Sequence, residues 1–176
     1  MMACIDVSID LETMGNGPDA AIIAIGAVEF SLETGQLGQE FYEVVDLESS
    51  VAAGGTITPS TVLWWMQQSD EARKVFERKG EQISLTLDHF TGWIYWLNGV
   101  RNVCLWGNGA AFDNVILRTA YERLGLKPPW NFWDDRCFRT IKALHPEVEF
   151  VKNGVVHNAL DDAKNQARYL MEVLKR

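Results

Sequence analysis

The stretch Cys4-Ile5-Asp6-Val7-Ser8-Ile9-Asp10-Leu11-Glu12-Thr13 is a strand-like run that ends in two acids one residue apart. Alternation along a strand puts Asp10 and Glu12 on one side and turns Leu11 to the other. Two carboxylates at the end of an apolar strand repel each other, so a fold tolerates them best with a positive charge between them. A hard divalent cation with oxygen ligands meets that demand. A solvated strand end is the simpler interpretation, and the pair alone favours it.

The length and composition predict one globular domain over residues 1–176, because the chain has 176 residues of which 47% are hydrophobic. The net charge of -8 argues against broad electrostatic binding of nucleic acid, which depends on Lys and Arg displacing counterions. Acids that hold metal ions count as negative in this total and are neutralised once metal binds. A small metal-mediated contact with a chain end therefore stays open.

The three cysteines, Cys4, Cys104 and Cys137, have no metal-site spacing, and each lies in or beside an apolar run. They predict reduced, buried thiols in a cytoplasmic protein. The N-terminus has no basic segment leading into an apolar one, and no apolar run reaches the ~18 residues of a spanning helix. We therefore expect neither export nor membrane insertion.

The strand pattern continues beyond the opening stretch. Residues 21–30 are rich in Ile, Ala and Val, and residues 41–45 alternate, which predicts a hairpin beside the first strand. Residues 46–58 are small and polar, and Gly54-Gly55 predict no regular element there. Residues 103–106 are short and apolar, which predicts a buried strand, and a short last strand is expected at residues 131–133.

Helices are expected where apolar residues recur at helical spacing. Pro59 suits a first turn with Thr58 as its cap, and this helix has an apolar face of Val62, Trp65 and Met66. Further helices are expected from Ser69, over about 84–97 and from about Asn158, and Trp93 and Trp96 lie on the apolar face of the second of these. Another is expected after Phe112, with Val115 and Thr119 on its inner side. A helix is also expected from about Cys137 to Leu144, with Asp134 or Asp135 as its cap. This order of elements predicts a mixed sheet covered by helices.

Further polar residues stand at predicted helix starts. Asp113 follows a Gly-rich loop, His157 precedes the last helix, and Asp161 and Asp162 fall in its first turn. Each has an ordinary explanation, since acids are favourable at helix N-termini and a loop histidine needs no function. Taken singly, the ordinary explanation is favoured, because motif fragments are common by chance.

Together these residues resemble the exonuclease motifs of the DnaQ-like, or DEDDh, superfamily. The three segments are Asp10-Leu11-Glu12-Thr13, Gly107-Asn108-Gly109-Ala110-Ala111-Phe112-Asp113 and His157-Asn158-Ala159-Leu160-Asp161-Asp162, and their order and spacing also fit. Within the superfamily, Trp64-Trp65, Trp106-Gly107-Asn108-Gly109 and Asp135-Arg136 look most like the phage DexA-type exonucleases and the bacterial RNase AS group.

The resemblance implies an α/β, RNase H-like fold, with about five strands in a mixed sheet, the first three antiparallel, and helices on both faces. It implies 3'-to-5' release of nucleoside 5'-monophosphates from the 3' ends of single-stranded DNA or RNA, and relatives suggest a homodimer. By position it makes His157 the general base, and it assigns two metal ions to Asp10, Glu12, Asp113 and Asp162. The family pattern selects Asp162 over Asp161, which helical periodicity alone hardly separates.

The implied chemistry suits these residue types. Two metal ions about 3.5 to 4 Å apart stabilise the attacking and leaving oxygens of a phosphodiester. Oxygen ligands predict Mg²⁺ or Mn²⁺, and Zn²⁺ is disfavoured because no cysteine or second histidine is placed to join. A histidine, with an unperturbed pKa of about 6.5, is suited to accept a proton at neutral pH.

Substrate contacts are expected close to the acids. Met14 and Phe112 are favoured as surfaces on which bases stack, at roughly 1 to 3 kcal/mol per base. The remaining candidates are Thr13, Asn108 and Trp64, the last of which lies off the apolar stripe of its helix. Many members carry His-Asn where this chain carries Gly107-Asn108, which leaves contacts at that loop open.

Two other functions stay open beside the exonuclease. One is a catalytically silent DnaQ-like domain that binds nucleic acid or a protein, and the other is a metal-dependent phosphatase acting on small nucleotides. The complete set of acids argues against silence, because a binding module has no reason to keep a like-charged cluster.

Overall fold

The structure is a computed structural model, and it describes residues 4–99, 102–109 and 111–175. Its centre is a five-stranded sheet in the order β3-β2-β1-β4-β5. The strands are β1 (Ile5–Thr13), β2 (Ile22–Ser31), β3 (Gln36–Val44), β4 (Val103–Gly107) and β5 (Asp135–Cys137). The first three are antiparallel, and β4 and β5 run parallel to β1. The predicted mixed sheet is confirmed.

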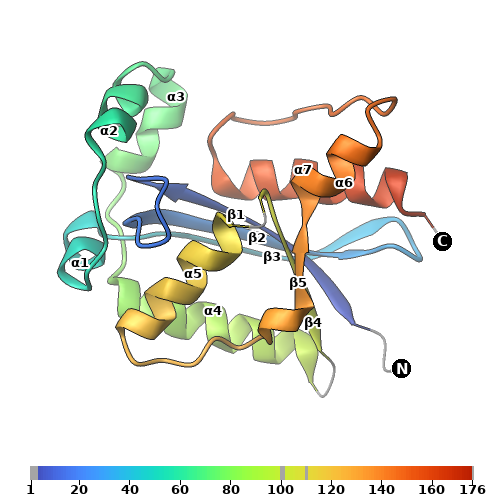
Figure 1. Ribbon diagram of the computed structural model, residues 1–176, viewed down its shortest axis with the longest axis horizontal. Helices are drawn as coiled ribbons and strands as arrows, with labels where there is room; N and C mark the ends of the chain where they lie inside the picture. The colour runs from blue at the N-terminus through green and yellow to red at the C-terminus, as the bar shows by residue number, and fades with distance from the viewer. Residues whose placement is uncertain (1–3, 100–101, 110, 176) are drawn as a thin grey trace.

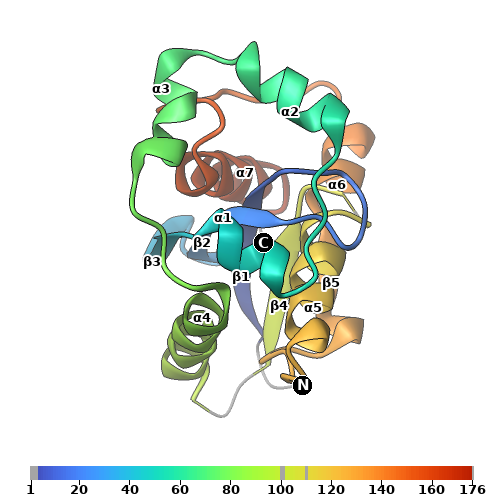
Figure 2. The same ribbon diagram turned by 90° about the vertical axis from the view of Figure 1, so that its left-hand side faces the viewer.

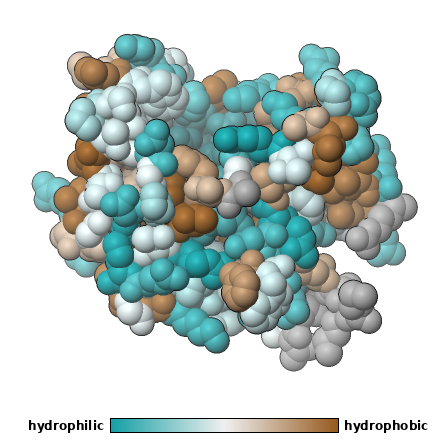
Figure 3. Space-filling view, in the orientation of Figure 1, coloured by the Kyte–Doolittle hydropathy of each residue, from teal (hydrophilic) through white to brown (hydrophobic). Residues whose placement is uncertain are grey.

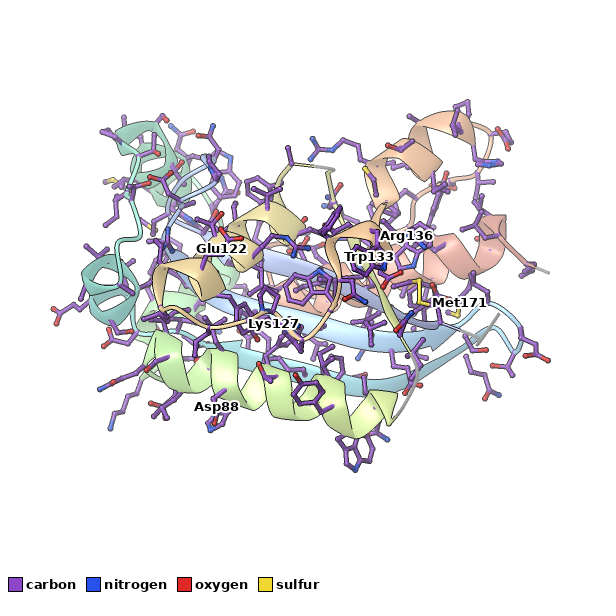
Figure 4. The ribbon with its side chains drawn as sticks, turned by 60° about the horizontal axis from the view of Figure 1, so that its bottom comes forward. Asp88, Glu122, Lys127, Trp133, Arg136 and Met171 are labelled. Carbon is purple, nitrogen blue, oxygen red and sulfur yellow. A yellow bond between two sulfur atoms is a disulfide. The ribbon has the colours of Figure 1, made fainter. Side chains whose placement is uncertain are left out.

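Helices cover both faces of this sheet, as expected (Figures 1 and 2). The α-helices are α1 (Leu47–Ala52), α2 (Pro59–Met66), α3 (Asp70–Arg73), α4 (Ile83–Asn98), α5 (Asp113–Arg123), α6 (Phe138–Leu144) and α7 (Ala159–Val173), and the 3-10 helices are η1 (Lys74–Glu77) and η2 (Phe132–Asp134). Helix α7 lies on one face, and α4 and α5 lie on the other (Figure 2). Figure 4 shows α4 running along its face of the sheet, with Asp88 on the side away from the strands.

The alternation in β1 divides the core in two. Val7, Ile9 and Leu11 are buried in one cluster with α4 and α5, to which Leu87 and Ile116 belong. The other cluster packs α7, through residues such as Ala163, Ala167 and Leu170, against β2 and β4. Because successive side chains point to opposite faces, the acids of β1 emerge on the α7 side of the sheet.

A short helix, α1, occupies the segment for which no regular element was expected. Asp46 caps it by accepting a hydrogen bond from the Glu48 N–H at 3.0 Å. The buried Ser50 hydroxyl accepts another from the Ile22 N–H at 2.9 Å. Tertiary contact with β2 thus stabilises six residues whose own pattern is too weak to predict a helix.

The last strand lies at β5 rather than at residues 131–133, which belong mostly to η2. Cys137, not Asp134 or Asp135, stands at the N-cap of α6. Both aspartates are used elsewhere, because each accepts hydrogen bonds from neighbouring side chains. Thr58 does stand at the N-cap of α2, although its side chain makes no capping hydrogen bond.

Several helices bury a narrower face than predicted. Met66, Trp96 and Leu144 are each about two thirds exposed, at 67%, 68% and 67%. In α5 the buried apolar residues are Ile116, Leu117, Ala120 and Tyr121, and Val115 and Thr119 are only partly buried. A periodic pattern marks which side of a helix is apolar, but it does not record how much of that side another element covers.

The cysteines differ from the expectation of three reduced thiols. Cys4, just before β1, forms a disulfide with Cys104 of the adjacent strand β4, and Cys137 is free. The parallel pairing of the two strands brings together sulfurs that are 100 positions apart in the sequence. None of the helices that the structure describes is long and apolar enough to cross a membrane.

Candidate active site

The site lies at the edge of the sheet where the parallel strands β1 and β4 both end. Asp10 and Glu12 come from β1, Asp113 opens α5, and Asp162 lies in the first turn of α7. Four of the five predicted residues, which are Asp10, Glu12, His157 and Asp162, line a cleft of about 400 Å³. Asp113, which is 1% exposed, is buried beside it. The structure thus brings the five residues together from opposite ends of the chain.

Asp113 is held by the backbone on both sides. The Leu11 N–H donates to Asp113 Oδ1 at 3.0 Å, and the Asn108 N–H donates to Oδ2 at 2.6 Å. Burial raises the pKa of Asp113 to about 6, and these two backbone hydrogen bonds oppose the rise. The carboxylate therefore has a fixed orientation between β1 and the loop after β4.

Asp10 and Glu12 resist ionisation more strongly. Burial, followed by the charges of Asp113, Glu12 and Asp162, raises the pKa of Asp10 well above its usual range, and a hydrogen bond from Gln166 Nε2 at 2.8 Å opposes this. Burial and the neighbouring Asp162 and Asp113 likewise raise the pKa of Glu12. Glu12 Oε1 is buried and has no hydrogen-bond partner among the described residues. The positive charge of Lys152 opposes the rise at Glu12 without cancelling it.

The donor set fits a divalent cation. Glu12, His157 and Asp162 each offer one ligand atom, and the three atoms lie within 4.8 Å of one another. Lys152 Nζ, the nearby ammonium group, stands 3.9 Å from Asp162 Oδ1. The unpaired Glu12 oxygen and the concentration of carboxylates point to a hard cation.

His157 is held in an unusual backbone conformation. Its φ of 64° lies in the left-handed region, and its N–H donates to Asp162 Oδ2 at 3.0 Å. The imidazole packs edge-on against Trp64 and Trp65, with ring centroids 4.8 and 6.2 Å away. Burial lowers the pKa of His157, which favours the neutral imidazole. Such strain is typical of a residue whose position matters for function.

The two adjacent acids of α7 have different surroundings. Asp162 faces the cleft, whereas Asp161 Oδ2 accepts a hydrogen bond from the Val155 N–H at 2.9 Å. The carboxylate of Asp161 also lies directly against Gly154. The selection of Asp162 for the acid cluster agrees with this geometry.

Four of the five substrate-contact candidates line the cleft, namely Thr13, Trp64, Asn108 and Phe112. Met14 does not, and its assignment as a stacking surface is wrong, because it is 6% exposed and packs with Ala21, Ile23 and Trp65. The hydroxyl of Thr13 donates to the Gly15 carbonyl at 2.7 Å. Trp64, 40% exposed, borders the cleft and supports His157.

Sequence reasoning missed Lys152, Arg139, Gln166 and Gly26. The first three line the cleft, and Gln166 stands four residues after Asp162, a spacing that puts both on one helix face. Gly26 pairs with Asp10 across β1 and β2. A Cβ there would lie 2.2 Å from backbone atoms of Ala159 and Leu160, so only glycine lets the start of α7 approach the sheet this closely.

The same fold occurs in known exonucleases. The nuclease domain of 3'hExo, a DEDDh family member solved with rAMP, matches with a TM-score of 0.68 and 17% identity, over 98% of this chain and 92% of that one. E. coli exonuclease I in complex with a dT13 oligonucleotide matches with a TM-score of 0.64 and 18% identity, over 97% of this chain and 41% of that one. The chain thus has the RNase H-like fold of these DEDDh-type exonucleases.

The family is defined by closer similarity. The family of the 3'-5' exoribonuclease Rv2179c-like domain matches residues 5–174, and the chain belongs to this family. The exodeoxyribonuclease of Enterobacteria phage T4 is 31% identical, over 79% of this chain and 71% of the phage protein. The protein is therefore a 3'-5' exonuclease, as the resemblance implied.

Proposed function

We propose that this exonuclease depends on divalent metal ions and removes nucleoside 5'-monophosphates one at a time from the 3' end of a single strand, with the whole chain acting as one domain. The observation that carries the proposal is the buried acid cluster at the cleft, in which Glu12 Oε1 has no partner among the described residues. A cluster whose members resist ionisation is destabilising unless it serves to bind cations.

Asp10, Glu12, Asp113 and Asp162 would hold two ions, and their oxygens favour Mg²⁺ or Mn²⁺. The bound ions would supply charge stabilisation to the attacking and leaving oxygens of an in-line displacement. The chain itself orients the ligands. Backbone N–H groups fix Asp113, Gln166 fixes Asp10, and the His157 N–H fixes Asp162.

His157 is the general base in this proposal and accepts the proton of the attacking water. Its lowered pKa keeps the imidazole neutral and able to accept at neutral pH. Trp64 and Trp65 hold the ring at the cleft, and the Trp65 Nε1–H is itself anchored on the Thr13 carbonyl at 2.9 Å. The two tryptophans are positioning residues for the base.

The substrate is a single-stranded chain end. Phe112 and Trp64 offer aromatic surface in the cleft, on which an unpaired base stacks whatever its identity. The family description names an exoribonuclease and the phage relative is an exodeoxyribonuclease, so both sugars need testing. The relatives described above give no support for a homodimer, which forms no part of the proposal.

Matched DNA and RNA oligonucleotides, labelled at either end, test this function. With Mg²⁺ or Mn²⁺, a 3' label should appear at once as mononucleotide, while a 5' label should pass through a ladder of shortening products. Asp10→Asn and EDTA should each abolish turnover, because the loss of one ligand or of the ions weakens the site. Release of inorganic phosphate would indicate a phosphatase, and binding without release would indicate a silent module. Strong activity of Asp10→Asn at saturating Mg²⁺ would contradict the metal assignment.

A further inference from the structure

A second hollow, of about 600 Å³, adjoins the cleft on the side of α6. It lies between the loop after β4 and one side of α6, which run near each other in Figure 1. Its lining is mostly apolar and includes Phe112, Ala143 and Leu144. Hydrophobic side chains also gather at the surface over α6 in Figure 3. Its volume falls within the range of small-molecule sites, about 300 to 1,000 Å³.

Two residues join this hollow to the cleft, because Phe112 and Arg139 line both. Arg139 Nη2 donates to the Asn108 carbonyl at 2.8 Å, which anchors the guanidinium at the boundary. Gly109 lies against it, since a Cβ there would be in ordinary contact with the guanidinium, 3.4 Å from Arg139 Cζ. A cation and an aromatic ring thus stand where a strand would pass from one space to the other.

We propose that the hollow binds the nucleoside on the 5' side of the scissile phosphate, the part of the strand that remains after cleavage. This inference rests on the proposed function, because it takes the acid cluster as the place of the scissile phosphate. The base contacts the apolar surface of Phe112 and Leu144, and the Arg139 guanidinium meets the adjoining backbone phosphate. Arginine suits a phosphate as a planar, always charged donor, and apolar surface suits a base face.

A charge placed in the hollow tests the proposal. Leu144 is 67% exposed at the end of α6, so Leu144→Glu should fold while repelling the strand. Leu85→Glu is the matched control, because Leu85 is 45% exposed on α4, on the opposite face of the sheet. Two substrates are compared, an oligonucleotide and the p-nitrophenyl ester of a nucleoside 5'-monophosphate, in which p-nitrophenol replaces the 5' strand.

Leu144→Glu should raise KM for the oligonucleotide by roughly 5- to 150-fold, the affinity equivalent of one stacked base. The kcat/KM of Leu144→Glu for the ester should stay within about twofold of wild type. For Leu85→Glu, KM for the oligonucleotide and kcat/KM for the ester should both stay within that range. Equal effects on both substrates, or no effect on the oligonucleotide, would overturn the subsite and leave the proposed function standing. A wild-type protein that cleaves no phosphodiester would overturn both.

Cys137 gives an independent readout that involves no turnover. It lines the hollow, and it is the free cysteine of the described residues, since Cys4 and Cys104 are paired. In Asp10→Asn with Ca²⁺, an oligonucleotide should slow alkylation of Cys137 by iodoacetamide, and a nucleoside 5'-monophosphate should not. Equal protection by the mononucleotide, or none by the oligonucleotide, would exclude a strand in the hollow.

Discussion

Replacing Gly26 with alanine tests whether the close approach of α7 to the sheet builds the active site. The added Cβ would lie 2.2 Å from Ala159 C and Leu160 N and 2.5 Å from Ala159 O, whereas ordinary contacts begin at 3.4 Å. All three are backbone atoms, so no side chain can rotate away and the start of α7 must move by about 1 Å. His157 and Asp162 stand within three residues of that point and must move with it.

Two effects of different size are expected. Overpacking should lower the free energy of unfolding by about 1 to 3 kcal/mol. A displacement of about 1 Å at the site should lower kcat by roughly 10²-fold. Denaturant unfolding and the release of labelled mononucleotide measure the two effects separately.

Gly92→Ala is the matched control. Gly92 lies within α4, and beyond the local helix backbone an added Cβ would meet no atom of the described residues within 4 Å. Alanine there should raise the free energy of unfolding by about 0.5 to 1 kcal/mol and leave kcat unchanged. A Gly26→Ala protein with wild-type kcat would refute the argument that the glycine positions the site.

The remaining predictions concern the base, the acids and the substrate. His157→Ala should lower the rate by roughly 10²- to 10⁴-fold while calorimetric titration still shows Mn²⁺ binding, and loss of that binding would make His157 a ligand. In EDTA, the free energy of unfolding should fall as pH rises from about 4 to about 6, because the unfolded chain loses the Asp113 proton near the ordinary aspartate pKa of 3.8 and the folded protein loses it near 6. Asp113 alone contributes about 3 kcal/mol to that fall, which urea unfolding at each pH measures. If adding Mg²⁺ left this dependence of the unfolding free energy on pH unchanged, the cation role of the cluster would be contradicted. Oligonucleotides of increasing length should bind Asp10→Asn in Ca²⁺ with an affinity that depends only weakly on salt, and they should dissociate in EDTA. Each phosphate neutralised by a basic side chain would add about 0.7 to the slope of log affinity against log salt concentration. A slope that grows with oligonucleotide length would reveal an extended basic track.

The sequence by itself determined the strands that carry the acids and the family to which the chain belongs. The alternation in residues 5–12 is local, so it placed Asp10 and Glu12 on one side of β1 without knowledge of the rest. The three motifs, in order and at the right spacing, likewise predicted Asp113, His157 and Asp162 as site residues before any contact was known.

Only the tertiary structure decided which neighbouring residues share the site. Asp161 and Asp162 differ by one helical step, and what separates them is the loop at Val155, whose N–H holds Asp161. Met14 follows the acids directly, yet packing against Trp65 buries it. Both outcomes depend on contacts between distant segments, to which a local pattern is blind.

The same limit explains the residues that were missed. Gln166 reaches Asp10 across 156 positions, and Gly26 matters only because the start of α7 lies on top of it. Cys4 and Cys104 are paired because β1 and β4 run side by side. Periodicity records which side of an element is apolar, whereas the distance between two elements is set by the side chains, or the missing side chain, at the point where they meet.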